Sequence, residues 1–341
     1  MVGLRLPSAL VGTATVPALY LLARHMWGRR LAFLSAALLA AYHYHIHYSR
    51  LGTNNVWDAF FAVLTFWALD VGLTASDGAK RRRALTLAGL VMGFSAYFYT
   101  GARLLPVLVA AYLVFYWVER RWQKGTVAQT EGPGWQLALV PLAFLVAAGP
   151  MLAFSLTHPD DWNARINQVG IVQSGWLARE PGLTGKSTAK ILAEQFLRAA
   201  GAFHVFPDRT VWYGIDRPLL GFLAGICGVL GMAWAAVHWR ERRYFLVLIW
   251  FWAAIITGGV LTESPPSSQR LVLAIPAVVL LVAIGVDQTL GLVQGVLRSG
   301  GVGNGVSPSA EGQAEAGHVR GKWGSVVVSL VVLVLAVSSI R

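Results

Sequence analysis

Cysteine and charge are both scarce in this sequence of 341 residues. The single cysteine, Cys227, excludes an intrachain disulfide and a metal site built from paired cysteines. Charged residues make up only 13% of the chain against 56% hydrophobic residues, and this balance excludes a water-soluble globular protein. The formal net charge of +12 is not accompanied by a recognised nucleic-acid-binding motif, so we expect no nucleic-acid partner.

Long hydrophobic runs with almost no charge fill most of the chain. About ten of them have roughly the 15 to 22 residues that a helix needs to cross the hydrocarbon core of a bilayer. The sequence therefore predicts an all-α, polytopic membrane protein with about ten transmembrane helices. The expected spans are Leu6–Ala23, Leu31–His47, Val56–Leu73, Ala84–Tyr99, Leu104–Val118, Gln136–Leu156, Leu219–Trp239, Tyr244–Leu261, Leu271–Leu290 and Ser325–Ile340.

Lys and Arg gather in alternate loops between these spans, for example at residues 80–83 and 240–243. Short cytoplasmic loops carry most of the basic residues of a membrane protein. The pattern predicts a multi-pass protein of the cell membrane, with its amino terminus and the long loop 158–217 on the outer face.

The domain organisation expected from these boundaries has five parts. Six helices in residues 1–157 precede an extracytoplasmic loop, 158–218. Three helices in 219–290, a flexible cytoplasmic linker in 291–323 and a last helix in 324–341 follow. Within the loop, Ser187 is a plausible N-cap for an amphipathic helix that ends at Ala200. This helix is expected either to lie in the membrane interface or to pack on the rest of the loop.

The most polar stretch near a predicted bilayer edge runs from His43 to Asp58. Polar residues at this depth are costly unless they are paired or hydrated, which marks the stretch as a candidate functional site. His43 and His47 share a helix face, which is compatible with two metal ligands, but no third ligand is evident. Hydrogen bonds to neighbouring helices and contact with an anionic lipid head group are the other two interpretations.

Three carboxylates differ in their expected surroundings. Asp58 lies one turn inside its span and needs a partner, whereas Asp70 lies near the opposite end and is more easily hydrated. Glu263 and Arg270 stand at the same outer surface as Asp58 and are expected to face the same cavity.

Several segments of the chain resemble bacterial membrane glycosyltransferases of family 39, relatives of protein O-mannosyltransferases and aminoarabinose transferases. The segments are Arg5-Leu-Pro-Ser-Ala-Leu, the basic turn Arg29-Arg30, the stretch from His45 to Asp58, Phe203-His-Val-Phe-Pro-Asp208, Asp216-Arg-Pro-Leu-Leu and the stretch from Pro266 to Pro276. The stretch from Tyr48 to Asp58 is the most specific of them.

This resemblance implies a GT-C fold and an outer-face site that transfers a sugar from a polyprenyl-phosphate donor to a hydroxyl of a protein, lipid or glycan. Whether a divalent metal takes part stays open. By resemblance Asp58 matches a family carboxylate, and Arg50 is the first candidate for the donor phosphate, with Arg270 second. The expected catalytic residues are Asp58 and Glu263. The expected substrate-binding residues are His45, His47, Tyr48, Arg50, Asn54, Asn55, Arg103 and Arg270.

The chain departs from the family pattern at its amino terminus. In the family, a further span and an outer loop with the principal acidic residue precede the segment that matches Arg5, whereas this chain has no acidic residue before Asp58. We expect either an amino-terminally shortened enzyme, which we favour, or an inactive relative. Two other classes remain as alternatives: a non-catalytic transporter or flippase of a lipid-linked saccharide, and a structural subunit that binds a partner through the outer loop.

Overall fold

The computed structural model describes residues 2–122, 132–211, 213 and 215–299. In these ranges the protein consists of helices and their connecting segments, with no β-strand and one isolated bridge between Gly170 and Thr262, so the all-α expectation is confirmed. The helices are α1 (Val2–Trp27), α2 (Arg29–Ala41), α3 (His43–Arg50), α4 (Asn55–Thr74), α5 (Gly78–Ser95), η1 (Thr100–Leu104), α6 (Leu105–Trp122), η2 (Gly134–Ala138), α7 (Leu139–Thr157), α8 (Pro159–Val169), α9 (Trp176–Thr184), α10 (Thr188–Ala200), η3 (Gly201–Phe203), α11 (Phe222–Val237), α12 (Arg242–Ile255), η4 (Ile256–Val260), α13 (Ser268–Leu271), η5 (Val272–Ala274) and α14 (Ile275–Ser299).

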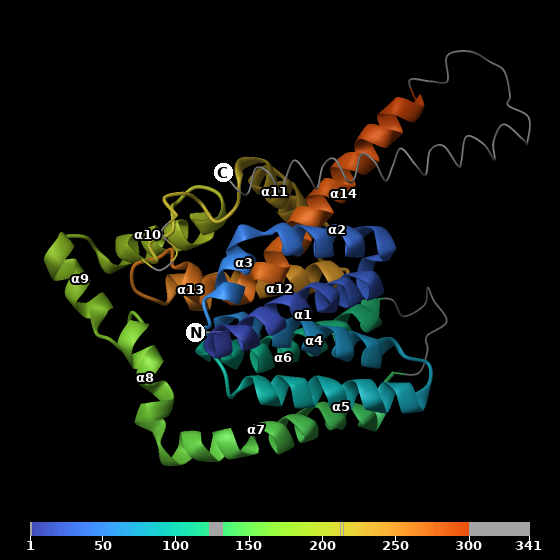
Figure 1. Ribbon diagram of the computed structural model, residues 1–341, viewed down its shortest axis with the longest axis horizontal. Coiled ribbons are helices and arrows are strands. Elements are labelled where there is room, and N and C mark those ends of the chain that lie inside the picture. Colours follow the sequence, from blue (N-terminus) through green and yellow to red (C-terminus); the bar gives the residue numbers. More distant parts are fainter. Residues whose placement is uncertain (1, 123–131, 212, 214, 300–341) are drawn as a thin grey trace, which may run out of the picture.

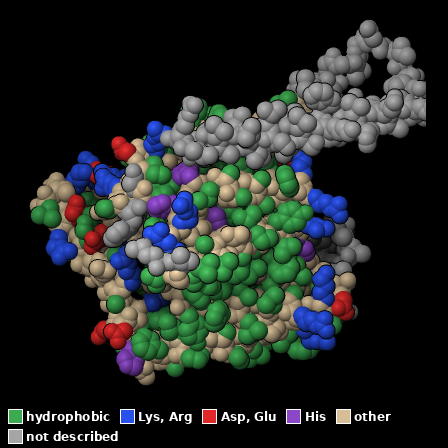
Figure 2. Space-filling view, in the orientation of Figure 1, with side chains coloured by type: hydrophobic (Ala, Val, Ile, Leu, Met, Phe, Trp, Pro, Cys, Tyr) green, Lys and Arg blue, Asp and Glu red, His purple; other side chains and the backbone are tan. Residues whose placement is uncertain are grey.

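The long helices lie side by side in a bundle, and α8 and α9 run across one end of it (Figure 1). Helix α5 packs between α4 and α7, and α1 packs on α2 and α4. A broad hydrophobic surface covers the flank of the bundle, with charged side chains toward its two ends (Figure 2). This distribution suits a bundle that is surrounded by lipid and meets water only at its ends.

Fewer helices than expected have the length and composition of membrane spans. Among the described residues six helices qualify, so the prediction of about ten spans is wrong in number. The six are Gly3–Trp27, Asn55–Thr74, Thr100–Trp122, Gly134–Thr157, Arg242–Val260 and Ser268–Gln294. The expected span Ser325–Ile340 lies outside the described residues.

Three expected spans fail for separate physical reasons. The segment Leu31–His47 is broken at Tyr42, whose extended backbone (φ −75°, ψ 110°) ends the 13-residue helix α2 and starts α3. Helix α5 has 18 residues but carries four basic side chains in its first turns. Helix α11 is apolar but only 16 residues long. Helix α14 also continues to Ser299, beyond the expected start of the linker at residue 291.

Small residues let α11 and α14 pack backbone to backbone. A Cβ atom on Gly231 would lie 1.8 Å from the carbonyl oxygen of Leu281, and one on Gly285 would lie 1.9 Å from that of Cys227. Close approach at glycine is a common way for helices to associate in membranes. It helps to bury α14, the most enclosed of the six candidate spans.

The two sets of loops gather at opposite ends of the bundle, as the charge pattern predicts. One end, here called the basic end, contains the ion pair between Arg30 and Asp287 and the ion pair between Arg242 and Asp70. The other, here called the α10 end, holds α3, α13 and the segment α8–α10 (Figure 1).

The predicted amphipathic helix is confirmed as α10. The Ser187 side chain caps it by accepting a hydrogen bond from the backbone N–H of Lys190. The Gln195 amide donates a 2.9 Å hydrogen bond to the carbonyl oxygen of Thr262, and Ala199 is fully buried against Gly259. The helix was expected either to lie in the membrane interface or to pack on the rest of the loop. In the structure the buried face of α10 packs on η4 and on Thr262.

Candidate functional site

A cavity of about 340 Å³ opens at the α10 end of the bundle. Its walls come from η1 and the start of α6, from α8, from the end of α12 with η4, and from α13 with η5. Arg103, Arg165 and Arg270 line it, and no acidic side chain does so among the described residues. The cavity therefore concentrates positive charge.

Arg103 is held in this wall by Trp162 of α8. Its guanidinium carbon lies 3.6 Å from the centre of the indole ring, and its Nη2 donates a 2.6 Å hydrogen bond to the Trp162 carbonyl oxygen. The Nη1 atom is buried and has no hydrogen-bond partner. Because a buried N–H group is normally paired, this atom is available to a ligand.

Arg270 faces the cavity from α13. Its Nη1 donates a 2.6 Å hydrogen bond to the carbonyl oxygen of Glu263, whereas its Nε is buried without a partner. Arg165 of α8 donates to the side chain of Gln168 at 2.8 Å. Since none of these three arginines forms an ion pair with an acidic side chain among the described residues, an anion in the cavity would meet guanidinium groups with unmet hydrogen bonds.

Asp58 lies behind the cavity wall and is only 2% exposed. The backbone of Tyr99 and Ala102 lies near its carboxylate, and Oδ2 lies against Gly101. Asp58 therefore fastens η1, which carries Arg103, to the start of α4. Its Oδ1 has no partner.

Glu263 lies beside the cavity. Its Oε1 accepts a 2.5 Å hydrogen bond from the hydroxyl of Ser174, and the neighbouring residues Thr262 and Gln173 line the cavity. Glu263 is half-buried. Both Glu263 and its partner Ser174 are therefore directly next to a residue of the cavity wall.

Tyr48 and Asn55 anchor α13 instead of lining the cavity. The Tyr48 hydroxyl lies 2.8 Å from the Ser268 hydroxyl, and the Asn55 amide donates a 3.0 Å hydrogen bond to the carbonyl oxygen of Gln269. These contacts join α3 and the start of α4 to α13, where the last described span begins.

Asp208 completes this anchor, although sequence reasoning gave it no role. Its two oxygens accept hydrogen bonds from the backbone N–H (2.7 Å) and the hydroxyl (2.6 Å) of Ser268. The only sequence signal was its place in the family-like segment that begins at Phe203. Arg165 was missed as well, because a basic residue in a long loop has no local pattern that marks it.

The three histidines of α3 are packing residues in this structure. His43 Nδ1 hydrogen-bonds to the hydroxyl of Tyr213, and His47 packs edge-on against the same ring at 4.7 Å. His45 Nε2 lies 3.0 Å from the carbonyl oxygen of Gly12. Burial lowers the pKa of His43 to about 4, and it also lowers the pKa of His45. No group of three His, Cys, Asp or Glu side chains in the described ranges could hold a metal ion.

Two predicted substrate-binding residues lie apart from the cavity lining. Arg50 is exposed at the end of α3, and Asn54 is exposed just before α4. Neither is among the residues that line the cavity.

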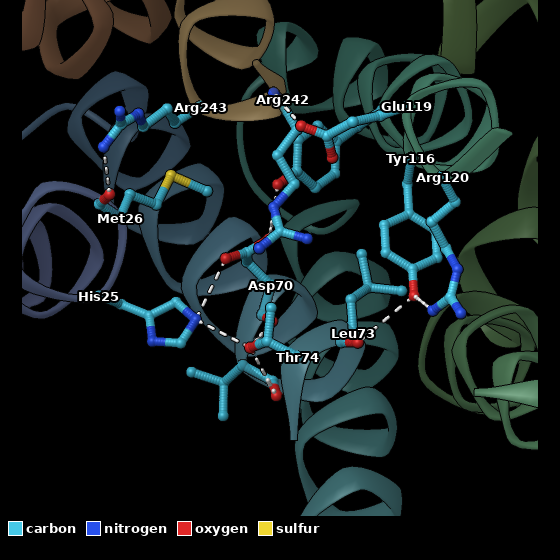
Figure 3. A network of polar contacts seen from close by, with 12 residues as sticks. His25, Met26, Asp70, Leu73, Thr74, Tyr116, Glu119, Arg120, Arg242 and Arg243 are labelled. Atoms are coloured by element: carbon cyan, nitrogen blue, oxygen red, sulfur yellow. Dashed lines mark hydrogen bonds and ion pairs between the residues drawn. The ribbon is translucent and has the colours of Figure 1, made fainter. Parts of the chain in front are cut away.

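A second polar cluster lies at the basic end, around Asp70 (Figure 3). Asp70 is 2% exposed, and its carboxylate lies 3.1 Å from His25 Nε2 and 3.2 Å from Arg242 Nε. The Tyr112 hydroxyl donates a 2.6 Å hydrogen bond to it, and Glu119 accepts a 3.0 Å hydrogen bond from the backbone N–H of Arg242. Asp70 is thus paired, not hydrated as expected, and it joins α1, α4, α6 and α12.

Comparison with known proteins finds a matching family model and solved structures with a similar fold. Residues 1–146 match the family model described as dolichyl-phosphate-mannose-protein mannosyltransferase. No curated protein matches the sequence. The solved structure of ArnT from Cupriavidus metallidurans bound to undecaprenyl phosphate is 19% identical, with a TM-score of 0.53, and the match covers 84% of this chain and 46% of that one.

A second solved structure is similar over almost the whole chain. The oligosaccharyltransferase of Archaeoglobus fulgidus, in its apo form, is 17% identical with a TM-score of 0.52, and the match covers 98% of this chain and 45% of that one. The chain therefore spans about half the length of the solved structures that it matches. The resemblance inferred from the sequence is confirmed: residues 1–146 match the protein mannosyltransferase family model, and the fold is that of the solved structures of ArnT and of the archaeal oligosaccharyltransferase.

Proposed function

We propose that this protein is a GT-C glycosyltransferase that moves a sugar from a polyprenyl-phosphate donor to a hydroxyl group. The donor phosphate binds in the cavity at the α10 end, and that end faces the outside of the cell membrane. The acceptor hydroxyl belongs to a protein, a lipid or a glycan.

One observation carries this proposal: Arg103, Arg165 and Arg270 surround a single cavity that no carboxylate lines among the described residues. Arg103 Nη1 and Arg270 Nε are buried and unpaired, so both gain a partner when a phosphate oxygen enters. Undecaprenyl phosphate in the similar ArnT structure supports a lipid phosphate as the ligand.

The arginines match the charge that develops during the reaction. The acceptor oxygen forms a bond to the anomeric carbon, the bond between that carbon and the phosphate oxygen breaks, and the electron pair leaves with the polyprenyl phosphate. Fixed guanidinium groups stabilise this negative charge as it grows, which lowers the barrier more than it strengthens binding of the intact donor.

The hydroxyl proton needs a base, and we assign this role to Glu263. Its neighbour Thr262 lines the cavity, and its carboxylate is hydrogen-bonded to Ser174, which follows the lining residue Gln173. Asp58 has a positioning role in this scheme, because it contacts η1 and thereby helps to position Arg103.

Binding of undecaprenyl phosphate to the purified protein tests the proposal. Trp162 is stacked on Arg103, so the part of the fluorescence change that is lost in Trp162→Phe reports a ligand in the cavity, against the background of the other tryptophans of the chain. We expect saturable binding that weakens at least tenfold in Arg103→Ala and in Arg270→Ala. Arg209→Ala is the matched control, because Arg209 is exposed and lies outside the cavity lining.

Transfer is then measured with a polyprenyl-phosphate sugar and a mixed pool of hydroxyl acceptors. Glu263→Gln should reduce turnover and leave binding of undecaprenyl phosphate within about twofold. Saturable binding that is equal in all three arginine variants would remove the cavity as the donor site.

A further inference from the structure

His204 holds a buried nitrogen without a hydrogen-bond partner. The residue follows η3, and its Nε2 atom is enclosed by protein and unpaired. Unsatisfied buried polar atoms are rare in native proteins, so each one calls for a physical explanation.

This nitrogen faces an apolar pocket of about 150 Å³. Among the residues that line the pocket are Gly228 and Met232 of α11, Phe251 of α12 and Val278 of α14. A Cβ atom on Gly228 would lie 3.4 Å from Nε2, which places the nitrogen at the α11 wall. Of the described residues that line the pocket, His204 is the one with a buried polar side-chain atom that lacks a partner.

The pocket lies at the depth of lipid chains. Helix α11 begins at Phe222 at the α10 end, and Gly228 and Met232 follow about 9 and 15 Å along its axis. The same helix exposes Phe222 and Val229, which are 81% and 55% accessible. These side chains give the surface around the pocket the apolar character that contact with lipid requires.

The size and chemistry of the pocket limit its ligand. Sites for whole small molecules usually have volumes of about 300 Å³ or more. A pocket half that size, with one buried and unpaired nitrogen, takes a short length of hydrocarbon and a single hydrogen-bonding oxygen. Burial lowers the pKa of His204, so the imidazole is neutral and Nε2 is either a donor or an acceptor.

We propose that the pocket between α10, α11, α12 and α14 binds one hydrocarbon chain of a membrane lipid, with a lipid oxygen hydrogen-bonded to Nε2 of His204. The lipid comes from the leaflet at the α10 end. A lipid hydroxyl can donate to Nε2 or accept from it, so it fits either tautomer of the imidazole. An ester oxygen only accepts, so it fits the tautomer that has the proton on Nε2.

This site is separate from the arginine cavity. Helix α12 presents Phe251 and Trp252 to the lipid pocket, whereas Ala254, and Thr257 of η4, line the arginine cavity. The two sites have no lining residue in common. Occupancy of the lipid pocket does not depend on the proposed transferase reaction.

Photocrosslinking tests the proposal on the full chain in nanodiscs that contain phosphatidylglycerol with a diazirine in one acyl chain. After illumination and digestion, we expect labelled peptides from α11 near Met232 and from α12 near Phe251. Gly228→Leu fills the pocket, and Val229→Trp places bulk on an exposed lining residue that folding does not require to be small. Each should lower the labelling of these peptides at least fivefold.

Leu230→Trp is the matched control, because Leu230 is on the same helix, 49% exposed and outside the pocket lining. Labelling should stay within about twofold there. His204→Phe keeps a ring in place but removes the nitrogen, and we expect it to lower labelling at least threefold. Unchanged labelling in Val229→Trp would overturn the pocket as a lipid site, and unchanged labelling in His204→Phe would overturn the hydrogen bond. Undecaprenyl phosphate binding to Val229→Trp, measured in parallel, should equal that of the wild type.

Discussion

Oδ2 of Asp58 lies 2.4 Å from the point where a side chain on Gly101 would begin. The carboxylate of α4 therefore occupies the space beside η1 that any other residue at position 101 would need. Because η1 carries Arg103, this contact between Asp58 and Gly101 helps to set the position of Arg103 in the wall of the arginine cavity.

The first prediction follows from that contact. In Gly101→Ala the added methyl group would overlap the Asp58 carboxylate, so η1 or α4 must shift, and we expect a loss of about 1 to 3 kcal/mol in the free energy of unfolding. Thermal unfolding in detergent, followed by tryptophan fluorescence, measures this loss. Gly182→Ala is the matched control, since nothing lies within 4 Å of its added Cβ and alanine favours a helix.

A second prediction separates positioning from catalysis at Asp58. Asp58→Asn keeps the shape but replaces one carboxylate oxygen by an amide NH₂ group, beside the backbone of Tyr99, Gly101 and Ala102. We expect undecaprenyl phosphate to bind about 3 to 10 times more weakly, because Arg103 moves, together with a loss of about 1 to 2 kcal/mol in stability. A loss of turnover with unchanged binding and stability would instead make Asp58 a reacting group.

The local features of this fold were predictable from the sequence, and the nonlocal ones were not. Ser187 capped α10 as predicted, because an N-cap acts within one turn of its own helix. The break at Tyr42 was missed, because its hydroxyl bonds to the carbonyl oxygen of Leu219, a residue far along the chain.

The same distinction applies to the site. Arg270 was predicted because it stands next to a span, and Arg103 because it lies at a loop of the expected outer face. Arg165 takes its place from the packing of α8 over η1, and Asp208 from the position of α13, and neither arrangement leaves a local pattern.

A third prediction concerns acid stability. The pKa of His43 falls from 6.5 to about 4 on folding because the imidazole is buried. At pH values above 6.5 both states are neutral and the fold keeps its full stability. As pH falls from 6.5 toward 4 the unfolded chain takes up a proton that the native state does not, so the free energy of unfolding decreases.

Thermal midpoints at pH 7 and pH 5 measure this effect. The difference between the two midpoints should be smaller in His43→Gln than in the wild type. His45 and His204, whose pKa values are also lowered by burial, account for part of what remains. His158→Gln, at an exposed site, should leave the difference unchanged.

A fourth prediction addresses the Asp70 cluster at the basic end. Asp70→Asn leaves Arg242 and His25 without their carboxylate, and removing one member of a buried ion pair typically lowers stability by about 3 kcal/mol. Tyr112→Phe removes one hydrogen bond and should lower stability by about 1 kcal/mol. The double variant should be less unstable than the sum of the two losses, because both changes act on one carboxylate. Strictly additive losses would show that Tyr112 and Asp70 do not interact.

The last prediction fixes the face of the membrane on which the arginine cavity lies. The clustering of Lys and Arg at the basic end predicts that this end is cytoplasmic and that α9 lies outside. Cys227 is the only cysteine, so Cys227→Ala gives a background into which single cysteines are introduced at Lys80 and Gly182. A maleimide that cannot cross the membrane should label Gly182→Cys in intact cells, whereas Lys80→Cys should react only after the membrane is permeabilised. The reverse pattern would place the cavity on the cytoplasmic side, and the proposed donor would then have to be presented from the inner leaflet.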